Sequence, residues 1–249
     1  MHQKNCFITL TYSDENLPQD GKLNYTHFQL FFKRLRKYAG KDIGFFMCGE
    51  YGETTQRPHY HACIFGWDPE DKQIWNESKH GDTLWTSKKL DELWGMNDPE
   101  KCPNKIGQVT QKSAGYVARY VLKKQGGPLG FQKMSRTHAI GKKFIEKWWQ
   151  DVFIAAKGSI ILEDGKKAKV PRYYEKWLKL NHPEEWLCYT TKIKPENTQR
   201  LKLKNETEHA IYLQEREARG FDGFSYQSPL ARKRDALKEK SKQLIRSYL

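Results

Sequence analysis

The apolar residues in the first part of the chain follow two periods in turn. The β-branched and aromatic run Cys6–Tyr12 predicts a buried strand that ends in a turn-rich segment. Residues 25–38 carry apolar side chains at helical spacing, with most of the basic side chains on the other side, and predict an amphipathic helix. Residues 43–51 and 59–65 each have a strand pattern. The polar segment 52–58 between them predicts a hairpin with a longer loop.

Farther along the chain the periods are interrupted. Residues 67–105 follow neither period and have scattered tryptophans as their apolar anchors, so we expect irregular structure there. A helical pattern returns over residues 111–124 and ends before a Gly-Gly-Pro sequence, which is typical of a helix stop. The order strand, helix, strand, strand, helix predicts an α+β fold with a central, mostly antiparallel sheet flanked by helices.

The second half of the chain has a different pattern. Residues 144–156 predict a helix, an Asp-Gly turn predicts a β-hairpin over residues 160–167, and the tail from about residue 231 is basic and helix-prone. We therefore expect a core domain over residues 1–130. A C-terminal extension over residues 131–249 would contain these helices, the hairpin and the basic tail.

The composition narrows the class of protein. Aromatic residues make up 13% of the 249 residues, which excludes a disordered chain despite a mean hydropathy of −0.88. No apolar run approaches the roughly 20 residues of a membrane span, so we expect no membrane partner. The five cysteines are scattered and never in C-x-x-C spacing, which is typical of reduced thiols in a cytoplasmic protein.

The charge of the chain predicts a polyanionic partner. With 44 Lys and Arg against 30 Asp and Glu, the formal net charge is +14. Nucleic acid is the favoured partner, because each phosphate neutralised by Lys or Arg releases counterions. Charge alone does not separate a DNA enzyme from a ribosomal or packaging protein, so motifs have to decide.

The first motif places two histidines on one strand. His59 and His61 project from the same face, about 6–7 Å apart along the chain, and can converge on one divalent cation. If the hairpin pairs Glu50 with His59, Glu50 lies on the histidine face and is the preferred third ligand, with Glu53 as its substitute. A bare His-x-His is nevertheless more often two ordinary strand histidines.

Two cysteines share the face of these histidines in the same pairing. Cys48 and Cys63 would allow a softer zinc site. Small buried core residues are the favoured interpretation of both.

The second motif lies in the helix predicted over residues 111–124. Tyr116 and Tyr120 are four residues apart and share one face, which Arg119 and Lys123 extend. By itself this pattern favours an amphipathic helix with tyrosines at its rim, packed through Val117 and its apolar neighbours. Two tyrosines among cations also suit a phosphoryl-accepting pair, because a cation stabilises the phenolate.

These segments, together and in this order, resemble the HUH-type rolling-circle replication initiators. In particular, they are similar to the initiators of single-stranded DNA phages of the microvirus group, the gokushovirus-like members. The resemblance extends over roughly residues 6–178. It rests mainly on the segments Phe7–Pro18, Cys48–Glu53, Arg57–Phe65 and Tyr116–Lys124.

The chain departs from the family pattern at two places. Family members often have an N-terminal extension with cysteine pairs, whereas this chain begins almost at its first strand, so a truncated chain or a late start codon is one expectation. Residues 138–140 also replace a more usual Pro-Gly before Ile-Gly, which changes little.

The resemblance implies an HUH endonuclease fold with an RRM/ferredoxin-like core. It also implies a metal-dependent, site-specific DNA endonuclease and strand transferase in the cytoplasm of a bacterial host. His59 and His61 would bind Mg²⁺ or Mn²⁺ with Glu50 as acidic partner. Tyr116 or Tyr120 would attack the single-stranded origin, form a 5′-phosphotyrosine link and later allow the ends to be rejoined in rolling-circle replication.

The resemblance also implies roles for nearby cations. Lys123 and Arg119 would stabilise charge at the reacting phosphate, and Lys124 and Arg57 would contact DNA. The 249 residues contain no Gly-x-x-x-x-Gly-Lys-Ser/Thr motif for nucleotide binding, so a host helicase and polymerase are the expected partners.

Two alternatives stay open. One is an HUH enzyme of another branch, such as a plasmid initiator or a transposase, although the tyrosine pair argues against single-tyrosine transposases. The other is a non-catalytic single-stranded nucleic-acid-binding protein or a decayed phage fragment, in which aromatic residues stack on bases and cations hold phosphates.

Overall fold

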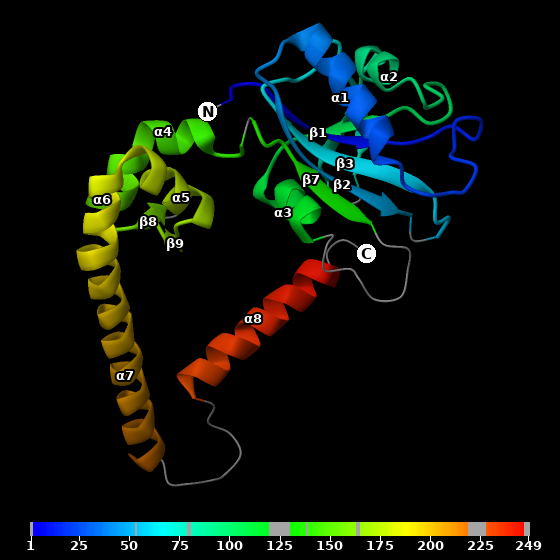
Figure 1. The fold of residues 1–249 in the computed structure, drawn as a ribbon. Coiled ribbons are helices and arrows are strands. Elements are labelled where there is room, and N and C mark those ends of the chain that lie inside the picture. The colour runs from blue at the N-terminus through cyan, green and yellow to red at the C-terminus, as the bar shows by residue number, and fades with distance from the viewer. Residues whose placement is uncertain are drawn as a thin grey trace. The chain divides into compact units, whose positions relative to one another are not determined.

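Figure 1 presents the computed structural model of the chain, which describes residues 2–52, 54–78, 81–119, 130–137, 139–162, 165–218 and 228–246. The chain divides into two compact units, Met1–Phe144 and Ile145–Leu249. Each unit is described by itself below.

A seven-stranded sheet organises unit 1, and all of its pairings are antiparallel. The strand order is β4-β5-β6-β1-β3-β2-β7, so β3 lies between its hairpin partner β2 and the first strand β1. The elements of this unit are, in chain order, β1 (Asn5–Leu10), α1 (Tyr25–Ala39), β2 (Gly44–Tyr51), β3 (Pro58–Phe65), β4 (Gln73–Glu77), β5 (Thr83–Thr86), α2 (Lys88–Trp94), β6 (Lys105–Gly107), α3 (Gln111–Arg119) and β7 (Phe131–Met134).

This architecture confirms the predicted α+β fold with an antiparallel sheet. The first strand, the first helix and the hairpin all lie where their periods predict them. Of the helix predicted over residues 111–124, α3 covers the part up to Arg119, and the remainder lies outside the described residues.

The prediction of irregular structure over residues 67–105 is wrong. This segment contains β4, β5, α2 and the start of β6. Helix α2 has only seven residues, begins after Ser87, whose side chain accepts from the Leu90 N–H, and ends at Gly95 in a left-handed conformation. Elements this short contain too few periods to be recognised and are held by single anchors such as the fully buried Trp94.

The first unit extends farther than the predicted core domain of residues 1–130. Strand β7 pairs with β2, so the sheet continues beyond residue 130, and the division between the units falls after Phe144. A four-residue strand at a sheet edge has too weak a pattern for its partner to be read from the sequence.

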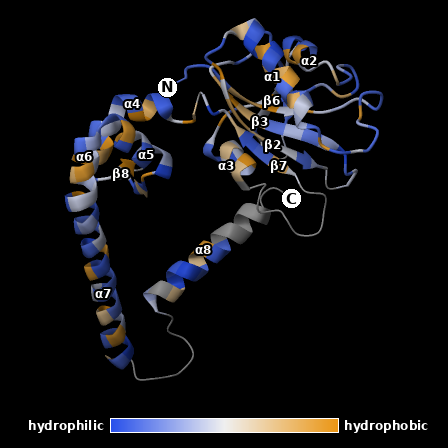
Figure 2. Ribbon diagram, in the orientation of Figure 1, coloured by the Kyte–Doolittle hydropathy of each residue, from blue (hydrophilic) through white to orange (hydrophobic). Residues whose placement is uncertain are grey.

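Alternation along β1 separates the two faces of the sheet. Cys6, Ile8 and Leu10 are buried in the core on the side of α1 and α2. Phe7 lies on the other face, where it packs against Val117 of α3. Figure 2 shows the apolar character concentrated on the strands and on one side of α1. Helices therefore pack on both faces, and the face beneath α3 is the one that carries the histidines of β3.

Tyr60 ties the central strand β3 to the start of α1. Its hydroxyl donates to the Asn24 carbonyl at 2.8 Å and accepts from the Asn24 N–H at 3.0 Å. It also lies 3.0 Å from the hydroxyl of Tyr12, and Asn24 is the N-cap of α1. Because Tyr60 stands between His59 and His61, burying it on the α1 side directs both histidines to the α3 side.

Unit 2 is a small helical unit with a hairpin. Its core contains Phe153, Tyr174 and Tyr189, and the Trp149 ring stacks on His182 with centroids 4.0 Å apart. None of the helices in the described part of the chain is long and apolar enough to cross a membrane. Its elements are α4 (Lys142–Gln150, which begins in unit 1), the π-helix η2 (Asp151–Ala155), β8 (Ser159–Ile161), β9 (Lys167–Lys169), α5 (Arg172–Asn181), α6 (Pro183–Cys188), the π-helix η3 (Tyr189–Ile193), α7 (Lys194–Ala218) and α8 (Pro229–Arg246).

Three of these elements correspond to predictions from the sequence. The helix predicted over residues 144–156 is confirmed by α4 and η2. The hairpin is confirmed by the pairing of β8 with β9, although Asp164 of its turn is outside the described residues. The helical tail is confirmed by α8 up to Arg246.

Replacing Tyr60 by Phe is expected to destabilise unit 1, because the ring is kept but both backbone groups of Asn24 lose a partner. An unsatisfied buried group costs about 1–3 kcal/mol, so we expect a loss of about 2 kcal/mol or more in urea unfolding. Tyr38→Phe is the matched control, since Tyr38 is 58% exposed. Equal unfolding free energies for the two variants would contradict this role of Tyr60.

Candidate functional site

Three side chains of the β2–β3 hairpin form a compact group. The hairpin pairs Glu50 with His59 and Cys48 with His61, as predicted. One potential ligand atom from each of Glu50, His59 and His61 lies within 4.8 Å of the others. The structure therefore brings together the two histidines and the preferred third ligand. The substitute ligand, Glu53, lies outside the described residues.

One oxygen of Glu50 accepts all the hydrogen bonds of this group. Oε1 lies 2.9 Å from Nε2 of His59 and 2.8 Å from Nε2 of His61, and it also accepts from the hydroxyl of Tyr116. Glu50 is only 4% exposed. Its second oxygen, Oε2, is buried and has no hydrogen-bond partner among the described residues.

The hydrogen bonds decide the ionisation state of this carboxyl group. Burial raises the pKa of Glu50, but hydrogen bonds from His59, His61 and Tyr116 outweigh burial, and the pKa lies far below its ordinary value. Glu50 is therefore an anion at neutral pH, with one oxygen facing three donors and the other facing none.

Contacts behind the histidines set the orientation of their rings. Nδ1 of His59 donates to the Arg57 carbonyl at 3.1 Å, since a carbonyl can only accept. Nδ1 of His61 lies 2.9 Å from Oγ1 of Thr9, and the Phe7 ring stacks on His61 with centroids 5.6 Å apart. Such partners leave Nε2 as the ring atom available to a metal.

Sequence reasoning missed the contributions of Thr9 and Phe7. Thr9 is a polar residue between the buried Ile8 and Leu10, which indicates the face on which it lies. Its position opposite His61 depends on β1 pairing with β3, and that pairing is not visible in either strand alone.

Helix α3 brings Tyr116 to the group through an apolar anchor. Val117 is fully buried against Cys48 and Cys63, with Ala114 beside it. The Tyr116 ring meets His61 edge-on, with ring centroids 5.0 Å apart. Burial raises the pKa of Cys63 to about 12, so its thiol stays protonated. Both cysteines are therefore core residues, as favoured from the sequence, and they anchor α3.

The residues of the group fit a divalent cation. Two imidazole nitrogens and one carboxylate form a mixed donor set within reach of one ion. The unpartnered buried Oε2 and the strongly acidic carboxyl group of Glu50 are both consistent with a cation in this place. The structure does not identify the ion.

The other predicted site residues lie partly beyond the description. Tyr120, Lys123 and Lys124 are outside the described residues, as is the side chain of Arg119, the last residue of α3. Arg57 donates to the Asp14 carboxylate and the Tyr12 carbonyl, so it braces the segment that follows β1.

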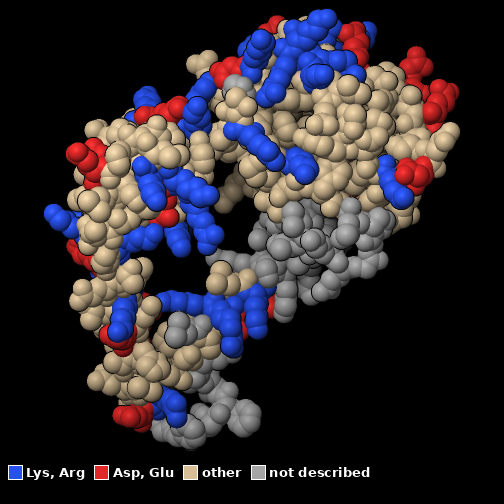
Figure 3. All heavy atoms as spheres, in the orientation of Figure 1, with Lys and Arg blue, Asp and Glu red and all other residues tan. Residues whose placement is uncertain are grey.

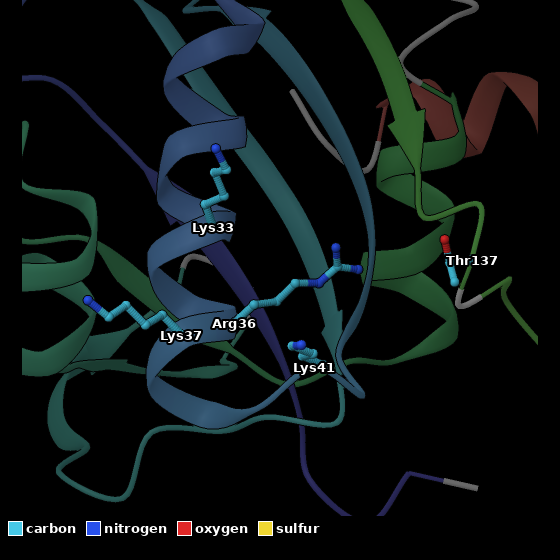
Figure 4. Close-up of a pocket in the computed structure, with 5 residues that line it drawn as sticks. All are labelled: Lys33, Arg36, Lys37, Lys41 and Thr137. Carbon is cyan, nitrogen blue, oxygen red and sulfur yellow. The ribbon is translucent and has the colours of Figure 1, made fainter.

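A separate basic cavity lies on the α1 side of unit 1. It has a volume of about 500 Å³ and is lined by Lys33, Arg36, Lys37, Lys41 and Thr137 (Figure 4). Among the described residues, none of its four cations has an ion-pair partner. Figure 3 shows Lys and Arg side chains gathered over α1. This cavity belongs to the opposite face of the sheet and contributes nothing to the metal group.

Comparison with known proteins gives one family match. Residues 5–125 match the ORF2 family of replication-associated proteins. The chain is 37% identical over 209 residues to the Replication-associated protein VP4 of Bdellovibrio phage phiMH2K, an alignment that covers 78% of this chain and 64% of that protein. It is 32% identical over 214 residues to the Replication-associated protein ORF2 of Spiroplasma virus 4, with 80% and 65% covered.

A third relative matches over a shorter stretch. The Replication-associated protein ORF4 of Chlamydia phage 1 is 37% identical over 131 residues, which cover 49% of this chain and 31% of that protein. The chain thus spans just under two thirds of the length of the first two relatives. No solved structure matches it.

The pKa of Glu50 predicts a specific loss of stability in acid. A carboxyl group with a depressed native pKa contributes stability above its unfolded pKa of about 4.3, and this contribution is lost as pH falls below that value. In metal-free buffer, the unfolding free energy of the wild type is expected to fall by about 1.4 kcal/mol per pH unit more than that of Glu50→Gln. Parallel pH profiles from urea unfolding would contradict the depressed pKa.

Mn²⁺ is expected to bind at the Glu50 group and to stabilise the fold. At an ion concentration of 100 times Kd, the gain in unfolding free energy is about 2.7 kcal/mol. Calorimetric titration with MnCl₂ would measure one site in the wild type and none in His59→Ala or His61→Ala. His209→Ala, an exposed histidine on α7, is the control. Unchanged Mn²⁺ affinity in both site variants would rule out these ligands.

Proposed function

The chain belongs to the ORF2 family of replication-associated proteins, and from this premise we propose that it is an HUH-type replication initiator endonuclease. It would nick single-stranded origin DNA through a tyrosine nucleophile and rejoin the ends during rolling-circle replication of a single-stranded DNA phage. The names of its relatives support a role in replication, and the proposed reaction goes beyond those names.

The observation that carries the proposal is the position of the Tyr116 hydroxyl. It donates to the same Glu50 oxygen that lies against Nε2 of both histidines. A phosphate held by a cation at these three ligands would therefore meet a phenolic oxygen directly. A tyrosine at the rim of a packing helix has no need of a buried carboxylate, so this contact favours the catalytic interpretation.

The proposed step exchanges one phosphate ester for another. The phenolic oxygen of Tyr116 bonds to phosphorus, the bond between phosphorus and the 3′-oxygen breaks, and the 3′-oxygen takes up a proton. The products are a 5′-phosphotyrosine link and a free 3′-hydroxyl that can prime synthesis. Because an ester replaces an ester, the reaction can run backwards and join ends.

Glu50 would orient the nucleophile rather than deprotonate it. Its pKa lies far below neutrality, so it is a poor general base, and the phenolic proton would pass to water. A bound divalent cation would polarise the scissile phosphate as a Lewis acid. The two imidazoles favour Mn²⁺ over Mg²⁺, which prefers oxygen ligands.

The remaining predicted residues keep their proposed roles. Tyr120, one helical turn beyond Tyr116 in the sequence, would be the second nucleophile of a cut-and-rejoin cycle. Lys123 and Arg119 would stabilise charge on the phosphate, and Lys124 would contact the DNA backbone. Arg57 would act there indirectly, since its guanidinium is engaged with Asp14 and the Tyr12 carbonyl.

The topology supports an HUH fold with an RRM/ferredoxin-like core. Strands β6, β1, β3 and β2 are adjacent in this order, and α1 and α2 pack on the same face, as in a β-α-β-β-α-β unit. Unwinding and synthesis would come from a host helicase and polymerase in the cytoplasm of the bacterial host.

The proposal is tested with a random-sequence library of single-stranded oligonucleotides labelled at the 3′ end. Cleavage would leave the label on the fragment joined to the protein, so a labelled adduct should appear on a denaturing gel with Mn²⁺ and not with EDTA. The adduct should fall by about 1000-fold or more in Tyr116→Phe/Tyr120→Phe. Tyr38→Phe, which changes an exposed tyrosine, is the control and should react like the wild type.

Two results would contradict the mechanism. An adduct that survives in the double variant would exclude a tyrosine link through these residues. DNA binding without cleavage in any divalent metal would favour the non-catalytic single-strand binder instead.

A further inference from the structure

An exposed tryptophan and a lysine lie together at one edge of the sheet in unit 1. Strand β4 is the edge strand, and all five of its residues are exposed. Trp75 on this strand is 48% exposed, and Nζ of Lys105 lies 3.5 Å from the centroid of its ring. Among the described residues, no carboxylate forms an ion pair with Lys105.

Strand pairing puts Lys105 on the same face as the metal group. Lys105 of β6 is paired with Thr9 of β1, and Thr9 is paired with His61 of β3. Paired residues of antiparallel strands point to the same side of a sheet. Lys105 therefore shares a face with His61 and lies two strand spacings from it, about 10 Å.

The alternation of β4 puts Trp75 on that face as well. Ile74 is paired with Trp85, which packs on the core of the other face. Trp75 follows Ile74 and so points the opposite way, at an irregularity in the pairing of β4 with β5. Its contact with Lys105 agrees with this orientation.

We propose that Trp75 and Lys105 form a binding site for single-stranded DNA, in which a base stacks on the indole and a phosphate pairs with the ammonium group. The inference deepens the proposed function, because this site would hold the strand a few nucleotides away from the phosphate that Tyr116 attacks. Both sites open onto one sheet face, so one strand can occupy them together.

The chemistry of the pair favours single-stranded nucleic acid over other partners. Every base has a π-face, and an accessible indole on a regular strand offers a stacking platform without sequence preference. A cation beside the platform suits the phosphate that accompanies each base, and the net charge of +14 complements a polyanion. A merely structural role for the pair would stabilise the edge strand through the cation–π contact and leave DNA affinity unchanged.

Fluorescence anisotropy with a labelled oligothymidylate in EDTA tests this inference without cleavage. We expect Trp75→Ala to weaken binding by about 5- to 150-fold, the range for loss of one stacked base. Trp75→Phe should restore most of the affinity because it keeps an aromatic face. Ile74→Ala is the matched control, since Ile74 is 76% exposed on the same strand but lies on the other face.

Lys105→Ala adds an independent readout. Loss of one phosphate contact should reduce the slope of log affinity against log salt by about 0.7, the value for single strands. Photocrosslinking with 5-bromouracil in the oligonucleotide should label Trp75, identified by mass spectrometry of the peptide. Wild-type affinity in Trp75→Ala together with crosslinks at other residues alone would overturn the inference.

Failure of this inference and failure of the proposed function are distinguishable. If Trp75→Ala binds and forms the phosphotyrosine adduct like the wild type, the inference fails and the nuclease proposal stands. If no adduct forms with any metal but binding depends on Trp75, the reverse holds.

Discussion

The hydrogen-bonded register of β2 against β3 is the constraint on which the candidate site depends. It pairs Glu50 with His59 and Cys48 with His61, so that three polar ligand atoms and two small thiols share one face. A slip of one residue would move this whole set of side chains to the α1 side, into an aromatic core. The buried Tyr60 opposes such a slip, because its hydroxyl holds both backbone groups of Asn24 on the other face.

Within this frame, one buried anion gathers the reactive groups. Oε1 of Glu50 faces two imidazoles and a phenol, whereas Oε2 faces no described partner. A carboxylate is costly to bury unless its donors compensate for lost water, and here three donors do so. The resulting cluster combines a mixed nitrogen and oxygen donor set with a hydroxyl nucleophile, which are the parts that phosphoryl transfer to a tyrosine needs.

The sheet also provides a surface beyond these residues. Because β1 lies between β3 and β6, the face that holds the histidines continues without interruption to Lys105 and Trp75. The basic cavity of α1 is on the opposite face and is separated from this surface by the sheet. Membership in a family of phage replication-associated proteins gives the positive charge of the chain a partner, and the sheet indicates which part of the surface faces the reacting strand.

The sequence by itself determined the features that depend on local periodicity. It predicted the first strand, the first helix, the hairpin with its Glu50–His59 pairing and the face shared by both histidines, because side-chain direction alternates along a strand. Only the tertiary structure decided which strands far apart in the chain meet: Thr9 and Phe7 against His61, β7 against β2, and Tyr116 against Glu50. Short elements such as α2 and β4 were missed for the same reason. Their stability comes from distant partners that bury their anchors, and a local pattern contains no information about those partners.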